Sequence, residues 1–142
     1  MAKRILVPLA DGGESAAVSV VRAVARDHGS TVRLLRVMPV PDRVVDRSGR
    51  TVSYADQEMA SLTARGLSEL ALAKSGLDGV PVESVVRFGA PLEEILLEAE
   101  AFEADLIAMT TTERGRLTSA VAPGVGERVL RKADVPVLLL RD

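Results

Sequence analysis

The sequence predicts an α/β fold, a doubly wound domain built on a five-stranded parallel sheet, and three observations support this prediction. Short apolar runs typical of buried strands alternate along the chain with segments whose apolar residues recur at the helical period. The 142 residues suit one domain, residues 1–142, without a linker or a low-complexity tract. Right-handed crossovers between parallel strands then place helices on both faces and a ligand crevice at the carboxyl ends of the central strands.

Two strands, one helix and a loop are expected in the first third of the chain. Residues 5–9 are a short apolar run and predict a buried strand, and residues 31–37 predict a second strand. A helix between them ends near Gly29, which supplies its C-cap. Its buried face consists of apolar residues at helical spacing, namely Ala17, Val20, Val21 and Val24. The segment from Met38 to Arg50 holds two prolines, a glycine and many charges, so we expect a long surface loop there.

The middle of the chain predicts a long helix followed by a third strand. Ser53 and Asp56 have the spacing of a capping box, so the helix should begin near Ser53, and Gly76 should end it. Its buried face is expected to carry Met59, Leu62, Leu70 and Ala73. Residues 82–88 then predict the third strand.

Two further helix and strand pairs complete the alternation. Pro91 is a favourable first helical residue, and the inner face of its helix should carry Leu92, Ile95, Leu96 and Ala99. The acidic residues of that helix, Glu93, Glu94, Glu98 and Glu100, are interpreted as a solvated face. Residues 106–109 predict a strand, residues 125–132 a helix, and the segment from Val135 to Leu140 a closing strand at a sheet edge. An apolar edge strand invites association, so pairing of this strand with a second copy is expected; the alternative is a monomer whose edge is covered by the helices.

Composition excludes several classes of function. The net charge of -2 provides no basic surface for nucleic acid. The chain has no cysteine, which excludes thiolate catalysis and cysteine-based zinc sites, and no apolar run is long enough to cross a membrane. Ser15 and His28 lie at opposite ends of the first helix, so with Asp11 they cannot form a triad. We therefore expect a cytoplasmic protein that is not an enzyme and has no metal site.

Three stretches resemble the universal stress protein family. They are RILVPLADGGESA near the start, VRFGAPLEEILLEAEAFEADLIAMTT in the second half, and GERVLRKADVPVLLLRD at the end. The resemblance implies a fold related to adenine-nucleotide-binding domains, with strand order 3-2-1-4-5. It also implies a homodimer and a role in stress physiology rather than a defined reaction.

Members of this family that bind ATP share a glycine motif, glycine-x2-glycine-x9-glycine-serine/threonine, which this chain lacks. Matching the motif puts Thr110, Glu113, Pro123 and Gly124 at its four positions. Thr110 adds bulk where the backbone should approach the ligand, and Glu113 brings a like charge close to the phosphates. Pro123 removes a backbone N–H, and Gly124 removes a hydroxyl. ATP binding in the family's usual manner is therefore not expected.

Two interpretations of the remaining loop are compatible with the sequence. Arg114, Arg116 and the amide of Val125 at a helix N-terminus could hold a smaller anion. Alternatively, the two arginines are solvated loop charges or pair with Glu113. The threonines Thr110, Thr111 and Thr112 could also be modified, although strand-end threonines are common.

The resemblance further assigns the adenine and ribose side of the pocket to Asp11, Val37 and Met109. The alternative is that Asp11 caps the first helix and that the other two are core residues. The leading hypothesis is a non-catalytic, dimeric stress protein without a cofactor that acts through a protein partner or a small ligand. The alternative is a sensor of ATP or AMP with a remodelled phosphate loop.

Overall fold

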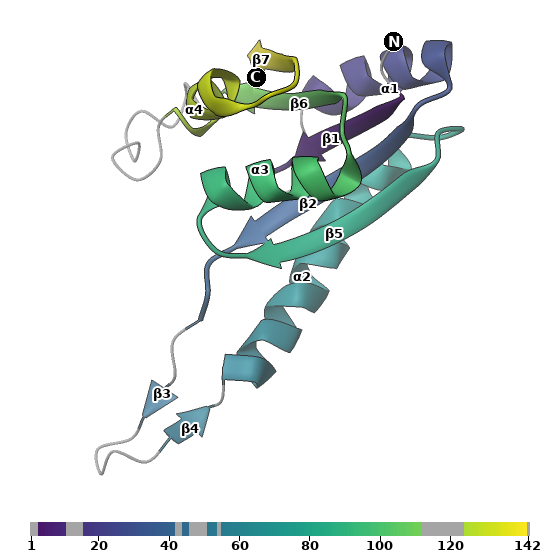
Figure 1. Ribbon diagram of the computed structural model, residues 1–142. Coiled ribbons are helices and arrows are strands. Elements are labelled where there is room, and N and C mark those ends of the chain that lie inside the picture. The colour runs from purple at the N-terminus through teal and green to yellow at the C-terminus, as the bar shows by residue number, and fades with distance from the viewer. Residues whose placement is uncertain are drawn as a thin grey trace.

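Five parallel strands form one sheet with helices packed on both of its faces (Figure 1). The computed structural model describes residues 3–10, 16–41, 44–45, 51–53, 55–111 and 124–141. The sheet contains β1 (Arg4–Pro8), β2 (Thr31–Met38), β5 (Val82–Phe88), β6 (Leu106–Thr111) and β7 (Val137–Arg141). Their spatial order is β5-β2-β1-β6-β7. Counted along the chain, this order is 3-2-1-4-5, so the predicted fold class and strand order are confirmed.

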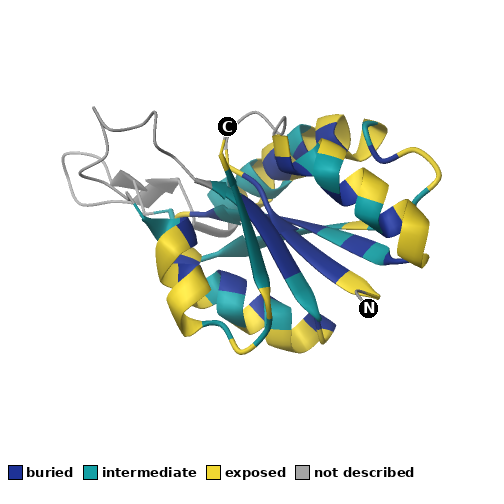
Figure 2. Ribbon diagram, turned by 90° about the horizontal axis from the view of Figure 1, so that it is seen from above, coloured by how far each residue is buried: buried dark blue, intermediate teal, exposed yellow. Residues whose placement is uncertain are grey.

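The central strand β1 divides the core into two halves. Ile5 and Val7 point to the face covered by α1 (Ala16–His28) and α2 (Ala55–Ser75), whereas Leu6 points to the face covered by α3 (Pro91–Phe102) and α4 (Val125–Lys132). All three side chains are fully buried. Figure 2 shows this buried strip of strands between two helical layers whose outer surfaces are exposed. Both faces of the parallel sheet are thus covered, as such sheets require.

The segment expected to be a loop, Met38 to Arg50, includes the first strand of a short hairpin, so that expectation is wrong in part. β3 (Val44–Val45) pairs antiparallel with β4 (Thr51–Ser53), and the pair lies apart from the main sheet (Figure 1). Ser53 therefore belongs to a strand, and α2 begins at Ala55 rather than near Ser53. Strands of two and three residues are too short to leave a periodic pattern in the sequence, which is why the hairpin was not expected.

The closing strand lies at the sheet edge as predicted, but it begins two residues later. The carbonyl of Pro136 accepts a hydrogen bond of 3.0 Å from the amide of Ile107. Proline has no N–H to continue a ladder, and β7 is paired with β6 only from Val137 onward. β6 in turn extends to Thr111, because Thr110 and Thr111 pair with Leu140 and Arg141.

The acidic face of α3 is not fully solvated, so that interpretation is wrong for Glu98 and for Glu94. The Glu98 side chain is only 4% exposed and lies between two guanidinium groups. Arg33 from β2 and Arg87 from β5 each donate a hydrogen bond to one of its carboxylate oxygens. Arg87 also donates to Glu94 at 2.7 Å, and Arg33 lies 4.2 Å from the ring centre of Phe102. Buried carboxylates are stable only when paired in this way.

Candidate functional site

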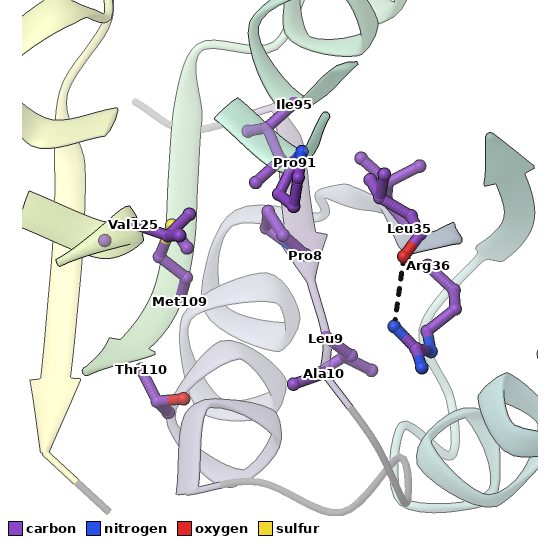
Figure 3. Close-up of a pocket in the computed structure, with 12 residues that line it drawn as sticks. Pro8, Leu9, Ala10, Leu35, Arg36, Pro91, Ile95, Met109, Thr110 and Val125 are labelled. Atoms are coloured by element: carbon purple, nitrogen blue, oxygen red, sulfur yellow. Dashed lines mark hydrogen bonds between the residues drawn. The ribbon is translucent and has the colours of Figure 1, made fainter. Parts of the chain in front are cut away.

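A cavity of about 210 Å³ opens at the carboxyl ends of the central strands (Figure 3). In a doubly wound sheet this is the place where the strand order reverses and where ligands bind. The strand ends, the two residues after β1 and the first turns of α3 and α4 line it: Pro8, Leu9, Ala10, Leu35, Arg36, Val37, Pro91, Ile95, Met109, Thr110, Val125 and Gly126. Most of these side chains are apolar, so the cavity suits a flat, largely apolar group with a few polar edges.

Arg36 is the one charged residue among the described residues that line the cavity. Its Nη1 donates a hydrogen bond of 3.1 Å to the carbonyl of Val37, and its Nε donates one of 3.0 Å to the carboxylate of Glu69 on α2. The first of these bonds is drawn in Figure 3. The guanidinium is largely buried, with 13% of the side chain exposed. Arg36 is therefore held in place at the wall of the cavity, and Glu69 balances its charge.

The N-terminus of α4 reaches the cavity because α4 packs directly against the sheet. A Cβ at Gly126 would lie 2.6 Å from Cδ1 of Leu139 and 3.5 Å from the carbonyl oxygen of Thr110. Glycine therefore permits the close approach of α4 to β6 and β7. The amides of the first helical turn have no helical acceptor, and they favour an anion at this end of the helix.

Gly124 precedes this turn as the N-cap residue of α4, with φ 82° and ψ 16°. This is the left-handed region of the backbone, which glycine enters readily and which side chains with a Cβ disfavour. No side-chain hydrogen bond caps the helix at this position. A serine or threonine in the place of Gly124 would have to adopt the same strained conformation or redirect the chain entering α4.

The structure brings four of the residues predicted for the site together around the cavity, namely Val37, Met109, Thr110 and Val125. Gly124 lies directly before Val125 as the N-cap of α4. The other three predicted residues, Asp11, Arg114 and Arg116, lie outside the described residues, as do Thr112, Glu113 and Pro123. Whether any of these residues contacts a ligand stays a prediction.

Several lining residues were not anticipated from the sequence, chiefly Pro8, Leu35, Arg36, Pro91 and Ile95. Some of them could have been predicted from the sequence, because the carboxyl ends of neighbouring parallel strands lie side by side at the crevice. Pro8 is paired with Leu35 at the ends of β1 and β2, directly before the two segments that enter the crevice. The participation of Arg36 has no local signal, since its orientation depends on Glu69, 33 residues further along the chain.

The described ranges contain neither a cluster of metal-ligating side chains nor a membrane-spanning helix. Among these residues there is no group of three or more histidine, cysteine, aspartate or glutamate side chains placed to hold a metal ion. None of the described helices is long and apolar enough to span a membrane.

The parallel sheet, its strand order and the crevice at its switch point define an α/β domain of the nucleotide-binding type. The family model described as "Universal stress protein family" matches residues 1–141. The chain therefore belongs to the universal stress protein family, as its sequence motifs indicated.

Two comparisons span almost the entire chain. A universal stress protein from Thermus aquaticus, encoded in the 3' region of a QAH/OAS sulfhydrylase, is 32% identical, with 99% of this chain and 100% of the relative covered. The solved structure of hypothetical protein MJ0577 is similar with a TM-score of 0.77 and 28% identity, covering 99% and 96% of the two chains.

Some structures of similar fold were solved with adenine nucleotides. A universal stress protein in complex with cAMP has a TM-score of 0.73 and 18% identity, covering 98% and 97% of the two chains. Related structures are a protein from Archaeoglobus fulgidus with dAMP and one from Arabidopsis thaliana with AMP, with TM-scores of 0.57 and 0.64. The latter two share 21% and 16% of their sequence with this chain. At these identities, the three structures establish the shared fold.

Proposed function

We propose that this member of the family is a non-enzymatic, cytoplasmic protein that acts in the stress response by binding a small ligand in the crevice. We further propose that the ligand is not ATP held through the family's glycine motif. The observation that carries the second statement is the left-handed backbone of Gly124 at the start of α4. The ATP-binding motif has serine or threonine at this position, and such a residue disfavours the conformation that this chain adopts.

The cavity supports binding of a ligand with a flat apolar body. Its walls come from three strand ends and two helix starts, so the lining is held by the core rather than by a single loop. Arg36 and the carbonyl of Val37 provide polar groups at one wall, and the first turn of α4 provides amides at another. A few polar groups in a mainly apolar cavity orient a ligand, and among the described lining residues there is no carboxylate or imidazole to act as a general base.

An adenine nucleoside monophosphate is the second, more specific candidate for this ligand. It is favoured by the relatives of the same fold solved with cAMP, dAMP and AMP, each of which carries one phosphate. In this chain the amide of Val125 with Arg114 and Arg116 would hold that phosphate, Asp11 the ribose, and Val37 and Met109 the base. One phosphate needs fewer main-chain donors than a triphosphate, so the loss of the glycine motif matters less.

Mass spectrometry of small molecules released from the purified, heat-denatured protein tests the general proposal. We expect a bound metabolite from the wild type and from Leu130→Trp, which alters an exposed residue of α4. Val125→Trp should fill the cavity on the same helix and leave the protein without the metabolite. A metabolite retained equally by Val125→Trp, or none released from the wild type, would contradict the proposal.

Calorimetric titration with AMP tests the specific candidate separately. We expect saturable binding to the wild type and to Leu130→Trp, and loss of binding in Val125→Trp. If the released metabolite is not an adenine nucleotide and AMP gives no saturable heat, the specific candidate is wrong while the general proposal stands.

We also propose that the chain is one domain over residues 1–142 and forms a homodimer through the segment from Val135 to Leu140.

A further inference from the structure

A second concave surface lies at the other end of the layer formed by α3 and α4. It is a groove of about 610 Å³ between α3, along which it runs from Glu93 to Glu103, and the segment that links α4 to β7. Its apolar lining comprises Leu96, Ala99, Ala104, Ile107, Ala133 and Val135. It shares no lining residue with the crevice cavity, which is bordered by the first turns of the same two helices. The groove is therefore a separate surface feature.

The border of this groove is acidic. Four carboxylates line it, those of Glu93, Glu100, Glu103 and Asp134, against the single basic residue Lys132. All four acidic residues are exposed, and within the described part of the chain Glu93, Glu100 and Asp134 form no ion pair. Glu103 has only a long contact of 3.8 Å with Arg4, and both side chains are more than half exposed. These charges contribute little to the fold and are available to a partner.

An exposed leucine, Leu97, also belongs to the apolar lining of the groove. Leu97 is 48% exposed and lies on α3 between the acidic residues Glu93 and Glu100. An apolar groove with charged edges is the arrangement by which proteins bind amphipathic helices, whose apolar residues enter the groove while their flanks pair with its border. The length of the groove also suits a short partner helix. Along α3 it extends about 15 Å, from Glu93 to Glu103 at 1.5 Å per residue, which equals two or three helical turns.

We propose that this groove, at the C-terminal ends of α3 and α4, binds a cationic amphipathic helix of a partner protein. The leucines or similar residues of that helix would contact Leu96 and Leu97, and its lysines or arginines would pair with Glu93, Glu100 and Asp134. The proposal is independent of the ligand in the crevice, since it depends on a different set of residues.

The experiment uses a fluorescent peptide of about 14 residues, in which leucines and lysines alternate at helical spacing to give four turns with one apolar face. Fluorescence anisotropy should show saturable binding that weakens as salt is added, since the flanking pairs are exposed. A peptide of the same composition in scrambled order, and one with glutamate in place of lysine, should bind at least about tenfold more weakly. Equal binding of either control peptide would overturn the proposal.

Matched variants distinguish the groove from general attraction to an acidic protein. Leu97→Arg and Glu100→Lys should each weaken binding of the lysine peptide about tenfold. Leu72→Arg, on α2, and Glu127→Lys, in the first turn of α4, change the charge equally at exposed positions outside the groove. These two variants should retain the wild-type affinity within about twofold.

Besides equal binding of a control peptide, three further outcomes would overturn the proposal. The first is equal weakening by the groove variants and the control variants, which would show that binding is not localised. The second is the absence of saturable peptide binding to the wild type. The third is a change of oligomeric state in Leu97→Arg without peptide binding, which would make the groove a contact between copies of this chain.

Discussion

Arg87 on β5 donates a hydrogen bond of 2.8 Å from Nη1 to Oε1 of Glu98, a buried carboxylate on α3. The second oxygen of Glu98 accepts a hydrogen bond from Arg33 on β2. One carboxylate thus connects the helix to two neighbouring strands. Because the first turn of α3 contributes Pro91 and Ile95 to the crevice cavity, these ion pairs also help to fix one wall of the candidate site.

Glu98→Ala should lower the free energy of unfolding by about 2 to 4 kcal/mol, because it leaves two guanidinium groups without their shared partner. The loss should be smaller than for a fully buried pair, since Arg33 and Arg87 are 22% and 30% exposed. Glu93→Ala, an exposed acidic residue on the same helix, should change stability by less than about 0.5 kcal/mol. Urea unfolding of the two variants checks this prediction, and equal losses would contradict it.

The contribution of these ion pairs should be independent of pH across the ordinary range. Burial lowers the pKa of Arg33, but the hydrogen bonds that Arg33 donates to Glu98 and Glu83 outweigh it and raise this pKa above the ordinary arginine value. The hydrogen bond with Glu94, followed by that with Glu98, raises the pKa of Arg87 above the same value. Since both arginine pKa values are higher in the folded state, and as long as the partner carboxylates are ionised, the stabilisation is present below the unfolded arginine value and is lost as the pH rises through the folded values.

The difference in unfolding free energy between the wild type and Glu98→Gln should therefore be equal at about pH 7 and about pH 10, both well below the ordinary arginine pKa. Urea unfolding of both proteins at the two pH values measures this difference. If this difference in unfolding free energy at about pH 10 were less than half of the difference at about pH 7, one of the arginines would have lost its proton, contrary to the prediction.

Gly124→Ser should destabilise the protein by about 1 to 2 kcal/mol, because serine disfavours the left-handed backbone at φ 82°. Space is not the limiting factor, since a Cβ at this position would meet only Oε1 of Glu127 at an ordinary 3.5 Å. Asparagine tolerates the left-handed region better, so Gly124→Asn should cost less than Gly124→Ser. Chemical denaturation of the wild type and both variants measures these differences in stability. A Gly124→Ser variant as stable as the wild type would refute this explanation.

Leu140→Lys should convert the proposed dimer to a monomer. Leu140 belongs to the edge strand β7 and is half-buried in the single chain. A lysine on an edge strand opposes pairing with another strand. Leu130→Lys, at an exposed position of α4, should remain dimeric. Light scattering coupled to size-exclusion chromatography measures both masses, and a dimer of Leu140→Lys would exclude this mode of pairing.

The main sheet and its helices could be predicted because their signals are local and repeated. The strands are rich in apolar and β-branched residues, and the predicted inner residues of α3, such as Leu92 and Ile95, are buried as expected. The hairpin of β3 and β4 could not be predicted, since two paired residues leave no period. The burial of Glu98 was also missed, because its partner Arg33 lies 65 residues earlier in the chain.

Part of the cavity lining coincides with residues that the sequence predicted for the site. Val37 and Met109 were named through the family resemblance, and the structure places both at the cavity. The left-handed conformation of Gly124 was not foreseen, because a glycine in a sequence shows that positive φ is permitted and not that it occurs. The orientation of Arg36 depends on a residue of α2 and is visible only in the folded chain.

Calorimetric titration of the wild-type protein with ATP and with AMP, both in the presence of magnesium, tests most directly whether this chain lacks the family's triphosphate site. If the chain provides no main-chain cradle for the second and third phosphates, ATP should bind no more than about threefold more tightly than AMP, a difference below 1 kcal/mol. ATP binding more than about tenfold tighter than AMP would show that the loop before Gly124 holds a triphosphate after all, and would contradict the account.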